Sequence, residues 1–345
     1  MDKKDIKSMT LDEITSEISD LNLPGYRAKQ IYSWLRKGAD SFEEMSNLPK
    51  SLRETLCNFF DIRGVKIKKK LESGVDDTVK YLYELYDGQF VESVLMKYHH
   101  GYTVCISSQV GCRMGCSFCA SGLLGLYRNL SASEMLAQIE MAGKDNGVRI
   151  SNVVMMGMGE PLDNLENTIR FLRLVSEPEG LGIGLRHISV STSGVVPGIY
   201  ELMKAEFPIT LSVSLHAPTN EIRSKIMKVN NAYPIEKLLK ACRDYIDVTG
   251  RRISFEYALI SGVNDSDECA DLLAAKLKGM LCHVNLIPAN PVKENSYSRP
   301  DEKMVNHFKN RLISCGINAT VRRTLGADIN ASCGQLRRKT LQEGV

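Results

Sequence analysis

Three cysteines stand close together about a third of the way along the chain. The stretch "GCRMGCSFCASG", residues 111–122, contains Cys112, Cys116 and Cys119, with three residues in the first gap and two in the second. Thiolates spaced in this way can all point at one inorganic centre. A structural zinc ion needs four ligands, which it usually takes as two separated pairs, and an ordinary iron–sulfur cluster also takes four cysteines. Three thiolates would leave one iron of a cluster open to another ligand, whereas zinc would need a distant fourth cysteine.

The composition around these cysteines is that of an ordinary folded protein. The chain has 345 residues, of which 43% are hydrophobic and 25% charged. This length suffices for one large domain with a smaller attachment. No apolar run is long enough to span a bilayer, and the first 20 residues lack the apolar centre of a signal peptide. We therefore expect a cytoplasmic protein, in which ten cysteines do not form a disulfide scaffold.

Strand-like and helical segments alternate over most of the chain. Strand-like runs cover residues 103–109, 152–160, 187–194, 209–217, 253–262 and 283–290. Helical patterns between and after them cover residues 131–145, 164–175, 234–248, 266–277 and 301–314. About six β–α units of this kind predict a parallel sheet with helices outside it. Because no GxGxxG follows the first strand, a dinucleotide-binding fold is disfavoured, and we predict an α/β fold, a partial TIM-like (βα)6 barrel.

Polar and glycine residues follow the predicted strands where each strand ends. They include the cysteine loop, residues 157–160, 191–193 and 214–216, and residues 285–290. The carboxyl ends of barrel strands are where barrel enzymes carry out their chemistry. We therefore expect these segments to form one site.

The first 90 residues differ from the rest and are mostly helical in pattern. Thr10 and Glu13 form a capping box ahead of a helical run, and a second helix is predicted within residues 24–38. Residues 78–100 alternate like a hairpin that turns at Asp87-Gly88. We predict a small, mostly helical accessory domain over residues 1–90. A core barrel over 91–320 and a C-terminal tail over 321–345 follow it.

Basic residues are concentrated in two places, although the net charge is only +3, from 44 basic and 41 acidic residues. Residues 318–345 contain five basic and two acidic residues. The stretch "RGVKIKKK" adds five more basic residues, which are Arg63, Lys66, Lys68, Lys69 and Lys70. Either patch alone is readily a solvated face. Together they favour a polyanionic partner such as RNA.

The cysteine triplet resembles the signature of the radical-SAM superfamily. Phe118 stands in its last gap, where that superfamily usually has an aromatic residue, and "MGMGEPL" resembles its glycine-rich stretch. The resemblance implies a [4Fe-4S] cluster with three cysteine ligands, Cys112, Cys116 and Cys119. The open iron would hold the amino and carboxylate groups of S-adenosylmethionine (SAM). An electron from the cluster would then release a 5′-deoxyadenosyl radical.

Longer segments narrow the resemblance to one group. The stretches "ISSQVGCRMGCSFCASG", "MGMGEPLDN", "HISVSTSG", "SVSLHAP", "HVNLIPANP" and "RRTLGADINASCGQL" occur together and in order. They resemble the RlmN group of methyltransferases, over nearly the whole chain including "YRAKQIYSWL". The resemblance implies a radical-SAM barrel with a small N-terminal helical domain. It also implies methylation of C2 of adenosine 2503 in 23S rRNA and of adenosine 37 in some tRNAs. An electron donor such as flavodoxin, a monomeric state and no membrane are implied as well.

Two further cysteines have roles in this family. C2 of adenine is electron-poor, so a direct methyl transfer from SAM would not reach it. The family uses two SAM molecules and an S-methylcysteine, which residue matching places at Cys333, with Cys105 as the resolving cysteine that forms a transient disulfide with it. Glu92 matches a carboxylate proposed as proton acceptor. Without the resemblance, the residues favour Cys105 as a buried strand residue and leave the role of Cys333 open. Glu92 is then equally an exposed strand residue.

The family's SAM contacts carry over to seven positions. They are Gly159, Glu160, Ser191, Ser214, Leu215, His216 and Asn290. Polar side chains at strand ends suit a zwitterion and a ribose. The alternative for each serine is a helix cap, because Ser after a strand often caps the following helix.

Other functions stay open on the sequence. Pro161 favours the C2 enzyme over the related C8-methylating resistance enzymes of the Cfr type, which tend to have Ala there. A radical-SAM enzyme for a small molecule would leave the basic N-terminal module without a role. A zinc-stabilised RNA-binding module would carry out no chemistry.

Overall fold

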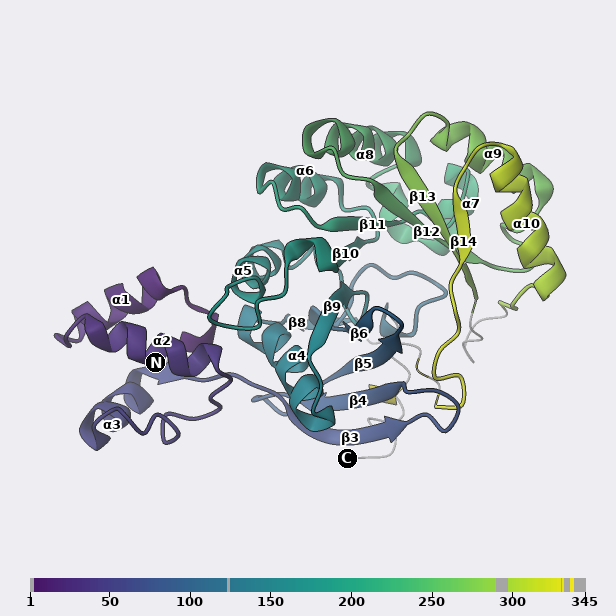
Figure 1. Cartoon of the computed structure of the whole chain (residues 1–345). Helices are drawn as coiled ribbons and strands as arrows, with labels where there is room; N and C mark the ends of the chain where they lie inside the picture. Colours follow the sequence, from purple (N-terminus) through teal and green to yellow (C-terminus); the bar gives the residue numbers. More distant parts are fainter. Residues whose placement is uncertain (1–2, 123–124, 290–296, 330, 332–335, 338–345) are drawn as a thin grey trace.

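The computed structural model describes residues 3–122, 125–289, 297–329, 331 and 336–337 (Figure 1). Its centre is a ten-stranded sheet with the order β14-β13-β12-β11-β10-β9-β6-β5-β4-β3. Seven of these strands run parallel: β6 (Gly101–Cys105), β9 (Ile150–Met155), β10 (Ile188–Thr192), β11 (Thr210–Ser214), β12 (Ile253–Leu259), β13 (Cys282–Pro288) and β14 (Ala319–Val321). The order runs from one edge to the other, so the sheet is an open, partial barrel.

Helices connect the parallel strands and cover one face of the sheet, as Figure 1 shows. They are α4 (Ala132–Asn146), α5 (Leu165–Val175), α6 (Val196–Lys204), α8 (Ile235–Thr249), α9 (Asp267–Leu277) and α10 (Glu302–Ser314). With the strands they make six β–α units followed by β14, which confirms the predicted (βα)6 arrangement. Of these six helices, α6 alone was not among the helical patterns read from the sequence. The apolar faces of these helices and the strand residues that point toward them form one large buried cluster.

Three antiparallel strands extend the sheet beyond β6. They are β3 (Lys66–Glu72), β4 (Val79–Glu84) and β5 (Phe90–Tyr98). The hairpin between β4 and β5 turns at Asp87-Gly88 as predicted, and Gly88 has the positive φ of 75° that such a turn requires. The basic stretch at residues 66–70 forms β3, the outer strand. Lysines on an edge strand discourage pairing with another chain.

The N-terminal residues form a helical module with its own hydrophobic cluster, between Ile6 and Phe60. It contains η1 (Ile6–Ser8), α1 (Leu11–Asp20), α2 (Tyr26–Arg36) and α3 (Lys50–Phe59), with β1 (Lys4–Asp5) paired to β2 (Phe60–Asp61). The predicted capping box is present, because Thr10 and Glu13 each accept a hydrogen bond from the other's main-chain N–H. The module covers residues well short of 90, and β3 and β4 belong to the central sheet. The division of the chain at residue 90 stays a prediction.

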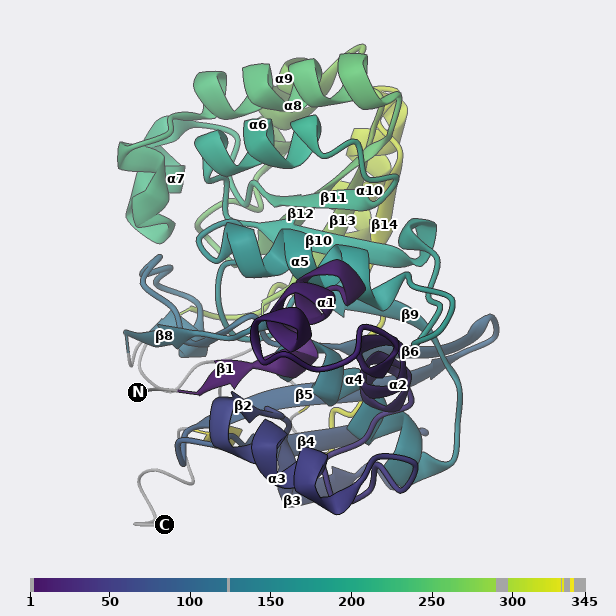
Figure 2. The same ribbon diagram turned by 90° about the vertical axis from the view of Figure 1, so that its left-hand side faces the viewer.

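Polar contacts attach this module to the outer face of α4 and α5, where Figure 2 shows α1 and α2. The Lys7 ammonium is buried and lies 2.7 Å from a carboxylate oxygen of Glu140 in α4. Arg170 in α5 donates to the Glu13 carboxylate at 2.5 Å. The module therefore packs against the helical layer. No helix in the described ranges has the length and apolar character needed to cross a membrane.

Candidate active site

The three clustered cysteines lie in a loop at the carboxyl edge of the sheet. After β6, the chain forms the short strand β7 (Gln109–Gly111), the cysteine loop, and β8 (Leu126–Asn129), which pairs back on β7. A side chain at Gly111, where φ is 87°, would collide with the Gly125 carbonyl oxygen. The Cys112 N–H donates to that same oxygen at 2.9 Å. Glycine at both positions therefore lets the loop fold back tightly and present its thiols at one edge.

The surroundings of these thiols suit a centre shielded from water. Burial raises the pKa of Cys112 to about 12, and burial also raises the pKa of Cys116. Cys116 and Phe118 pack against an apolar cluster that includes Ile226 and Ile260. Thiols in such a place stay protonated at neutral pH unless a metal centre displaces the proton.

The donor set consists of three thiols in one partly buried loop, and thiolates are the ligands that iron–sulfur clusters take. Among the residues that the structure describes, no three His, Cys, Asp or Glu side chains converge closely enough to hold one metal ion. An iron–sulfur cluster takes one thiolate on each of several irons, so its ligands are spread more widely than those of one ion.

The glycine-rich loop at residues 157–160 is fastened to the segment that leads into the cysteine loop. The N–H of Gly157 donates to the Ile106 carbonyl at 3.0 Å, and the N–H of Glu160 donates to the Gln109 side-chain oxygen at 2.8 Å. A Cβ on Gly159, where φ is 106°, would lie only 2.7 Å from the Gln109 nitrogen. Gly159 is therefore required for close packing of two loops, in addition to its predicted contact with SAM.

Glu160 is buried and joins this loop to the end of the next strand. Its carboxylate accepts main-chain hydrogen bonds from Ser193 at 2.6 Å and from Leu162 at 3.1 Å. Burial raises its pKa, while these hydrogen bonds oppose that rise. The structure thus brings Glu160 beside Ser193, which directly follows β10, the strand that contains the predicted SAM contact Ser191.

His216 lies directly after β11 in a left-handed backbone conformation, with φ at 55°. Its Nδ1 accepts a hydrogen bond from the Ala258 N–H at 2.8 Å, so the neutral ring carries its proton on Nε2. Burial, and then the nearby Arg223, lower the pKa of His216 to about 3. The stretch Ser214–His216 is therefore an uncharged, rigid part of the site.

Arg223, in α7 (Asn220–Ile226), is a residue of the candidate site that sequence reasoning missed. Its guanidinium is fully buried and donates to the carbonyl oxygens of Ser193, Ser214 and Leu215 at 2.6, 3.1 and 3.0 Å. Burial lowers its pKa to about 10. It ties the ends of β10 and β11 together. The surrounding "NEIRSKI" resembles any exposed helix, so no signal in the sequence distinguishes Arg223.

The face of the sheet opposite the helices, which we call the open face, carries polar side chains. Ser191 pairs in register with Ser212, and Ser214 pairs with Glu256, which pairs with Asn285. Residues that pair across strands, and residues two apart in a strand, point to the same face. The Asn285 amide donates to the buried Glu256 carboxylate at 2.8 Å. Glu256 had not been predicted as a site residue, and it extends the polar lining across the open face.

Glu92 and Cys105 occupy the same open face on two neighbouring strands. Cys105 pairs with Val94 of β5, two residues beyond Glu92. Glu92 is 1% exposed, so its interpretation as an exposed strand residue was wrong. Its carboxylate lies 3.0 Å from the Lys80 ammonium and accepts the Arg337 N–H at 2.7 Å. Cys105 is buried, as its alternative interpretation expected. Cys333 and Asn290 lie outside the described residues.

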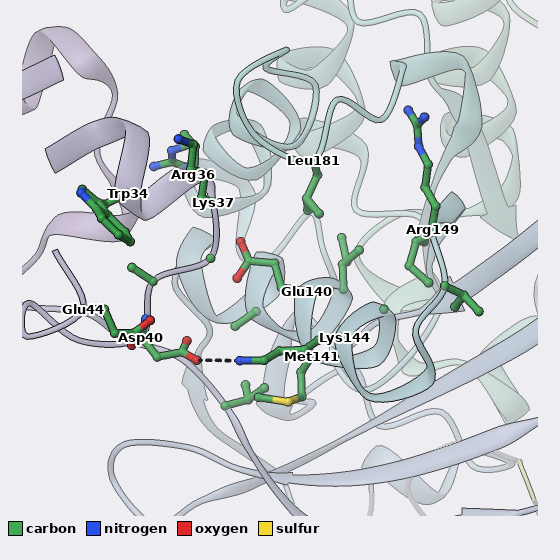
Figure 3. Close-up of a pocket in the computed structure, with 18 residues that line it drawn as sticks. Trp34, Arg36, Lys37, Asp40, Glu44, Glu140, Met141, Lys144, Arg149 and Leu181 are labelled. Carbon is green, nitrogen blue, oxygen red and sulfur yellow. Dashed lines mark hydrogen bonds and ion pairs between the residues drawn. The ribbon is translucent and has the colours of Figure 1, made fainter. Parts of the chain in front are cut away.

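A pocket of about 440 Å³ lies elsewhere, between the N-terminal module and α4 (Figure 3). Trp34 of α2 and Glu140 of α4 both line it, and Lys144 and Asp40, which also line it, form an ion pair of 3.9 Å. None of the residues predicted for the site lines this pocket. The candidate active site is therefore the carboxyl edge and open face of the sheet.

Comparisons with known proteins identify the family to which the chain is similar. The family profile "Radical SAM superfamily" matches residues 106–273, and "Ribosomal RNA large subunit methyltransferase N-terminal domain" matches residues 4–62. A probable dual-specificity RNA methyltransferase RlmN of Alkaliphilus oremlandii is 54% identical, covering 99% of this chain and 100% of its own length. The protein of the same name from Clostridioides difficile is 52% identical, with coverages of 98% and 99%.

A solved structure extends the likeness to three dimensions. The crystal structure of a radical SAM methyltransferase from Sphaerobacter thermophilus superposes with a TM-score of 0.91 at 46% identity, over 96% of this chain and 98% of that one. The radical SAM α/β fold and the N-terminal module are thus shared with that enzyme. From these matches and the geometry of the site, the chain belongs to the RlmN family of radical SAM RNA methyltransferases.

Proposed function

We propose that this enzyme methylates C2 of adenosine in 23S rRNA and tRNA through an S-methylcysteine at Cys333. The observation that carries the proposal is the course of the C-terminal tail. Leu325 and Ala331 pack on the cluster that contains Cys105, and the Arg337 N–H reaches Glu92. The described residues on both sides of positions 332–335 therefore lie on the face that holds Cys105.

The residues proposed to hold the cofactors are those at the carboxyl edge. Cys112, Cys116 and Cys119 would ligate a [4Fe-4S] cluster, which when bound supplies the electron that cleaves SAM. The predicted SAM contacts are Gly159, Glu160, Ser191, Ser214, Leu215, His216 and Asn290. All but Asn290 are described, and they occupy the ends or the open face of β9, β10 and β11.

The chain's own thiols would perform the transfer. Once the methyl carbon on the Cys333 sulfur has lost a hydrogen atom and bonded to C2, the adduct would return one electron to the bound cluster and lose the C2 proton, which leaves protein and RNA joined through a C2–CH2–S link. The Cys105 thiolate then attacks that sulfur and a disulfide forms. The carbon–sulfur bond breaks with its electron pair on the carbon, which takes up a proton and becomes the methyl group of the freed base. We assign Glu92 the role of accepting the C2 proton. Its carboxylate lies 3.0 Å from the Lys80 ammonium, and Glu92 is two residues from Val94, which pairs with Cys105.

RNA binding is proposed for the basic patch at one end of the sheet. Lys66, Lys68 and Lys69 are exposed on β3, where they can meet phosphates. Arg63 and Arg128 both lie over the Tyr86 ring, at 4.4 and 4.8 Å from its centroid. Tyr86 follows β4, which runs parallel to β6, so this group lies on the same edge as the cysteine loop. The target adenosine would have to leave its stack to enter the site.

Other parts of the proposal rest on the family resemblance. The C2 position is favoured over the C8 position of Cfr-type enzymes by Pro161 and by the RlmN names of the relatives. These relatives also argue against a small-molecule substrate and a zinc-stabilised binding module. An electron donor such as flavodoxin, a monomeric state and a cytoplasmic location are proposed on the same basis.

The test separates the two transfer cysteines. Cys333→Ala should form no covalent link to RNA, whereas Cys105→Ala should form the link but not release it. Each variant is purified from cells and run on a denaturing gel before and after ribonuclease treatment, with Cys315→Ala, at an exposed thiol beyond α10, as control. An adduct in Cys333→Ala, or none in Cys105→Ala, would reverse or remove these roles.

A further inference from the structure

Two carboxylates hold the tail at the amino edge of the sheet. One belongs to the tail and accepts hydrogen bonds from the loop before β4, and the other belongs to that loop and accepts a hydrogen bond from the tail. Asp328 in the tail accepts hydrogen bonds from the Ser73 hydroxyl and the Gly74 N–H, both at 2.8 Å. In return, Asp76 accepts the N–H of Gly326 in the tail at 2.9 Å. These residues stand about 250 positions apart in the chain. We call this group of Ser73, Gly74, Asp76, Gly326 and Asp328 the tail clasp.

The clasp is tightly built on both sides. A Cβ at Gly326, where φ is 59°, would lie 2.9 Å from the Thr78 methyl group and 2.7 Å from the Ala331 side chain. The Thr78 N–H in turn holds the second oxygen of Asp76 at 2.9 Å. The hydrogen bonds from Ser73 and then Gly74 lower the pKa of Asp328, so this carboxylate is charged at neutral pH. Charge-assisted hydrogen bonds of this kind are stronger than neutral ones.

The second fastening lies near the opposite edge. The Arg337 N–H donates to Glu92 at 2.7 Å, and Leu336 packs against Leu82 and Phe90. The loop of Ser73 to Thr78 precedes β4, whereas Phe90 begins β5, which runs antiparallel to β4. The two fastenings therefore stand toward opposite ends of the same strands. Figure 1 shows the chain leaving β14 and descending to the loop between the end of β3 and the start of β4, where the first fastening lies.

These contacts give the β3–β4 hairpin a role that the sequence did not suggest. Asp328 precedes Cys333 by five residues, and Arg337 follows it by four. Between the two fastenings, Ala331 packs on the cluster of Val94, Met96 and Cys105. We propose that the tail clasp is a positioning device, in which Asp328 and Asp76 set where Cys333 meets Cys105 and SAM. This inference rests on the proposed function of Cys333.

The tail clasp is expected to affect the position of Cys333, because the transfer requires the Cys333 sulfur, a SAM molecule and the target base to be aligned. A misplacement of about 1 Å can cost about 100-fold in rate. The hydrogen bonds of both aspartates join the loop of residues 73–78 to the tail, at the amino edge of the sheet. A loss of the clasp should therefore slow methylation of Cys333 while the fold and the SAM-cleaving edge persist.

The experiment uses the full-length protein and two readouts. The first follows methyl label from SAM onto the peptide that contains Cys333, by mass spectrometry. The second follows trypsin cleavage after Arg322 and Arg323 in the protein without added SAM. Asp328→Ala should slow labelling by about 100-fold and speed tail cleavage several-fold, with Tm within about 2 °C of the parent. Asp328→Asn keeps one acceptor oxygen and should fall between.

Asp77→Asn is the matched control, because Asp77 lies in the same loop but pairs with Lys97 of β5 at 3.1 Å. In this variant, the peptide that contains Cys333 should gain label, and trypsin should cleave the tail, at the rates of the parent. Labelling and cleavage at parent rates in Asp328→Ala would overturn the clasp, as would an equal loss in Asp77→Asn. If the parent itself gains no label on Cys333, the proposed function fails, and the cleavage assay alone still decides whether Asp328 holds the tail.

Discussion

Phe118 and His216 meet edge to face, with their ring centroids 4.9 Å apart and their ring planes at 88°. Phe118 stands between the second and third clustered cysteines, and His216 follows β11. The His216 ring is held by the Ala258 N–H, and its carbonyl oxygen accepts from the Asn264 amide at 2.7 Å. The cysteine loop thus rests on a residue anchored to β12. This contact makes the proposed cluster ligands and the proposed SAM contacts parts of one rigid edge.

Replacing any one of Cys112, Cys116 or Cys119 by Ala should abolish SAM cleavage, because two thiolates cannot retain the cluster. Iron and sulfide content should fall together in protein purified without oxygen, and its brown colour should fade. Cys315→Ala is the control, because Cys315 is exposed and distant from the loop in sequence. Full 5′-deoxyadenosine production in any of the three loop variants would contradict the assignment.

Gly159→Ala should destabilise the protein by at least about 2 kcal/mol and weaken SAM binding. The added methyl group would stand 2.6 Å from the Gln109 Cβ and 2.7 Å from its nitrogen, which forces the two loops apart. Denaturant unfolding and SAM titration measure the two effects.

Gly262→Ala separates crowding from backbone strain. Gly262 also has a positive φ, of 70°, but no atom lies within 4 Å of its Cβ position. This change should cost only about 1 kcal/mol and leave SAM binding intact. Equal losses in the two variants would show that close packing at Gly159 is unimportant.

Reversing Lys66, Lys68 and Lys69 to Glu should weaken RNA binding and flatten its dependence on salt, since fewer counterions are then released. SAM cleavage without RNA should persist. Lys70 is left unchanged because it pairs with Asp145 at 2.8 Å and with Glu72 at 2.6 Å, so its reversal would disturb the fold.

The comparison protein for this test carries three Glu substitutions at exposed lysines of the outer helical layer, Lys237, Lys278 and Lys303. Both triple variants change the net charge equally. If they bind RNA with the same affinity and the same salt dependence, the basic strand contributes only general charge.

Lys7→Ala should lower the free energy of unfolding by about 3 kcal/mol, because it leaves the Glu140 carboxylate without its buried cation. Lys4→Ala removes a neighbouring pair with Glu17, in which the lysine side chain is 59% exposed, and should cost under about 1 kcal/mol. Urea unfolding of both variants measures the difference. Similar small effects would mean that the N-terminal module is held to α4 mainly by other contacts.

The amino-acid sequence determined the features that depend on neighbours in the chain. The capping box of Thr10 and Glu13, the hairpin turn at Asp87-Gly88 and the six β–α units were predicted and are present. Each depends on side-chain types and spacings within a few turns or one strand. The cysteine triplet is local in the same sense, and with the other segments it identified the family.

Only the tertiary structure decided which distant residues meet. Arg223 tying β10 to β11, Glu256 beside Asn285, and Lys80 beside Glu92 depend on the order and register of strands. The contact of Asp328 with Ser73 joins residues 255 positions apart. Hydrophobic periodicity predicts which face of a strand or helix is buried but carries no information about its partner. The packing of the whole sheet brings these polar groups together, and for the buried ones, Arg223, Glu256, Lys80 and Glu92, burial makes a partner necessary.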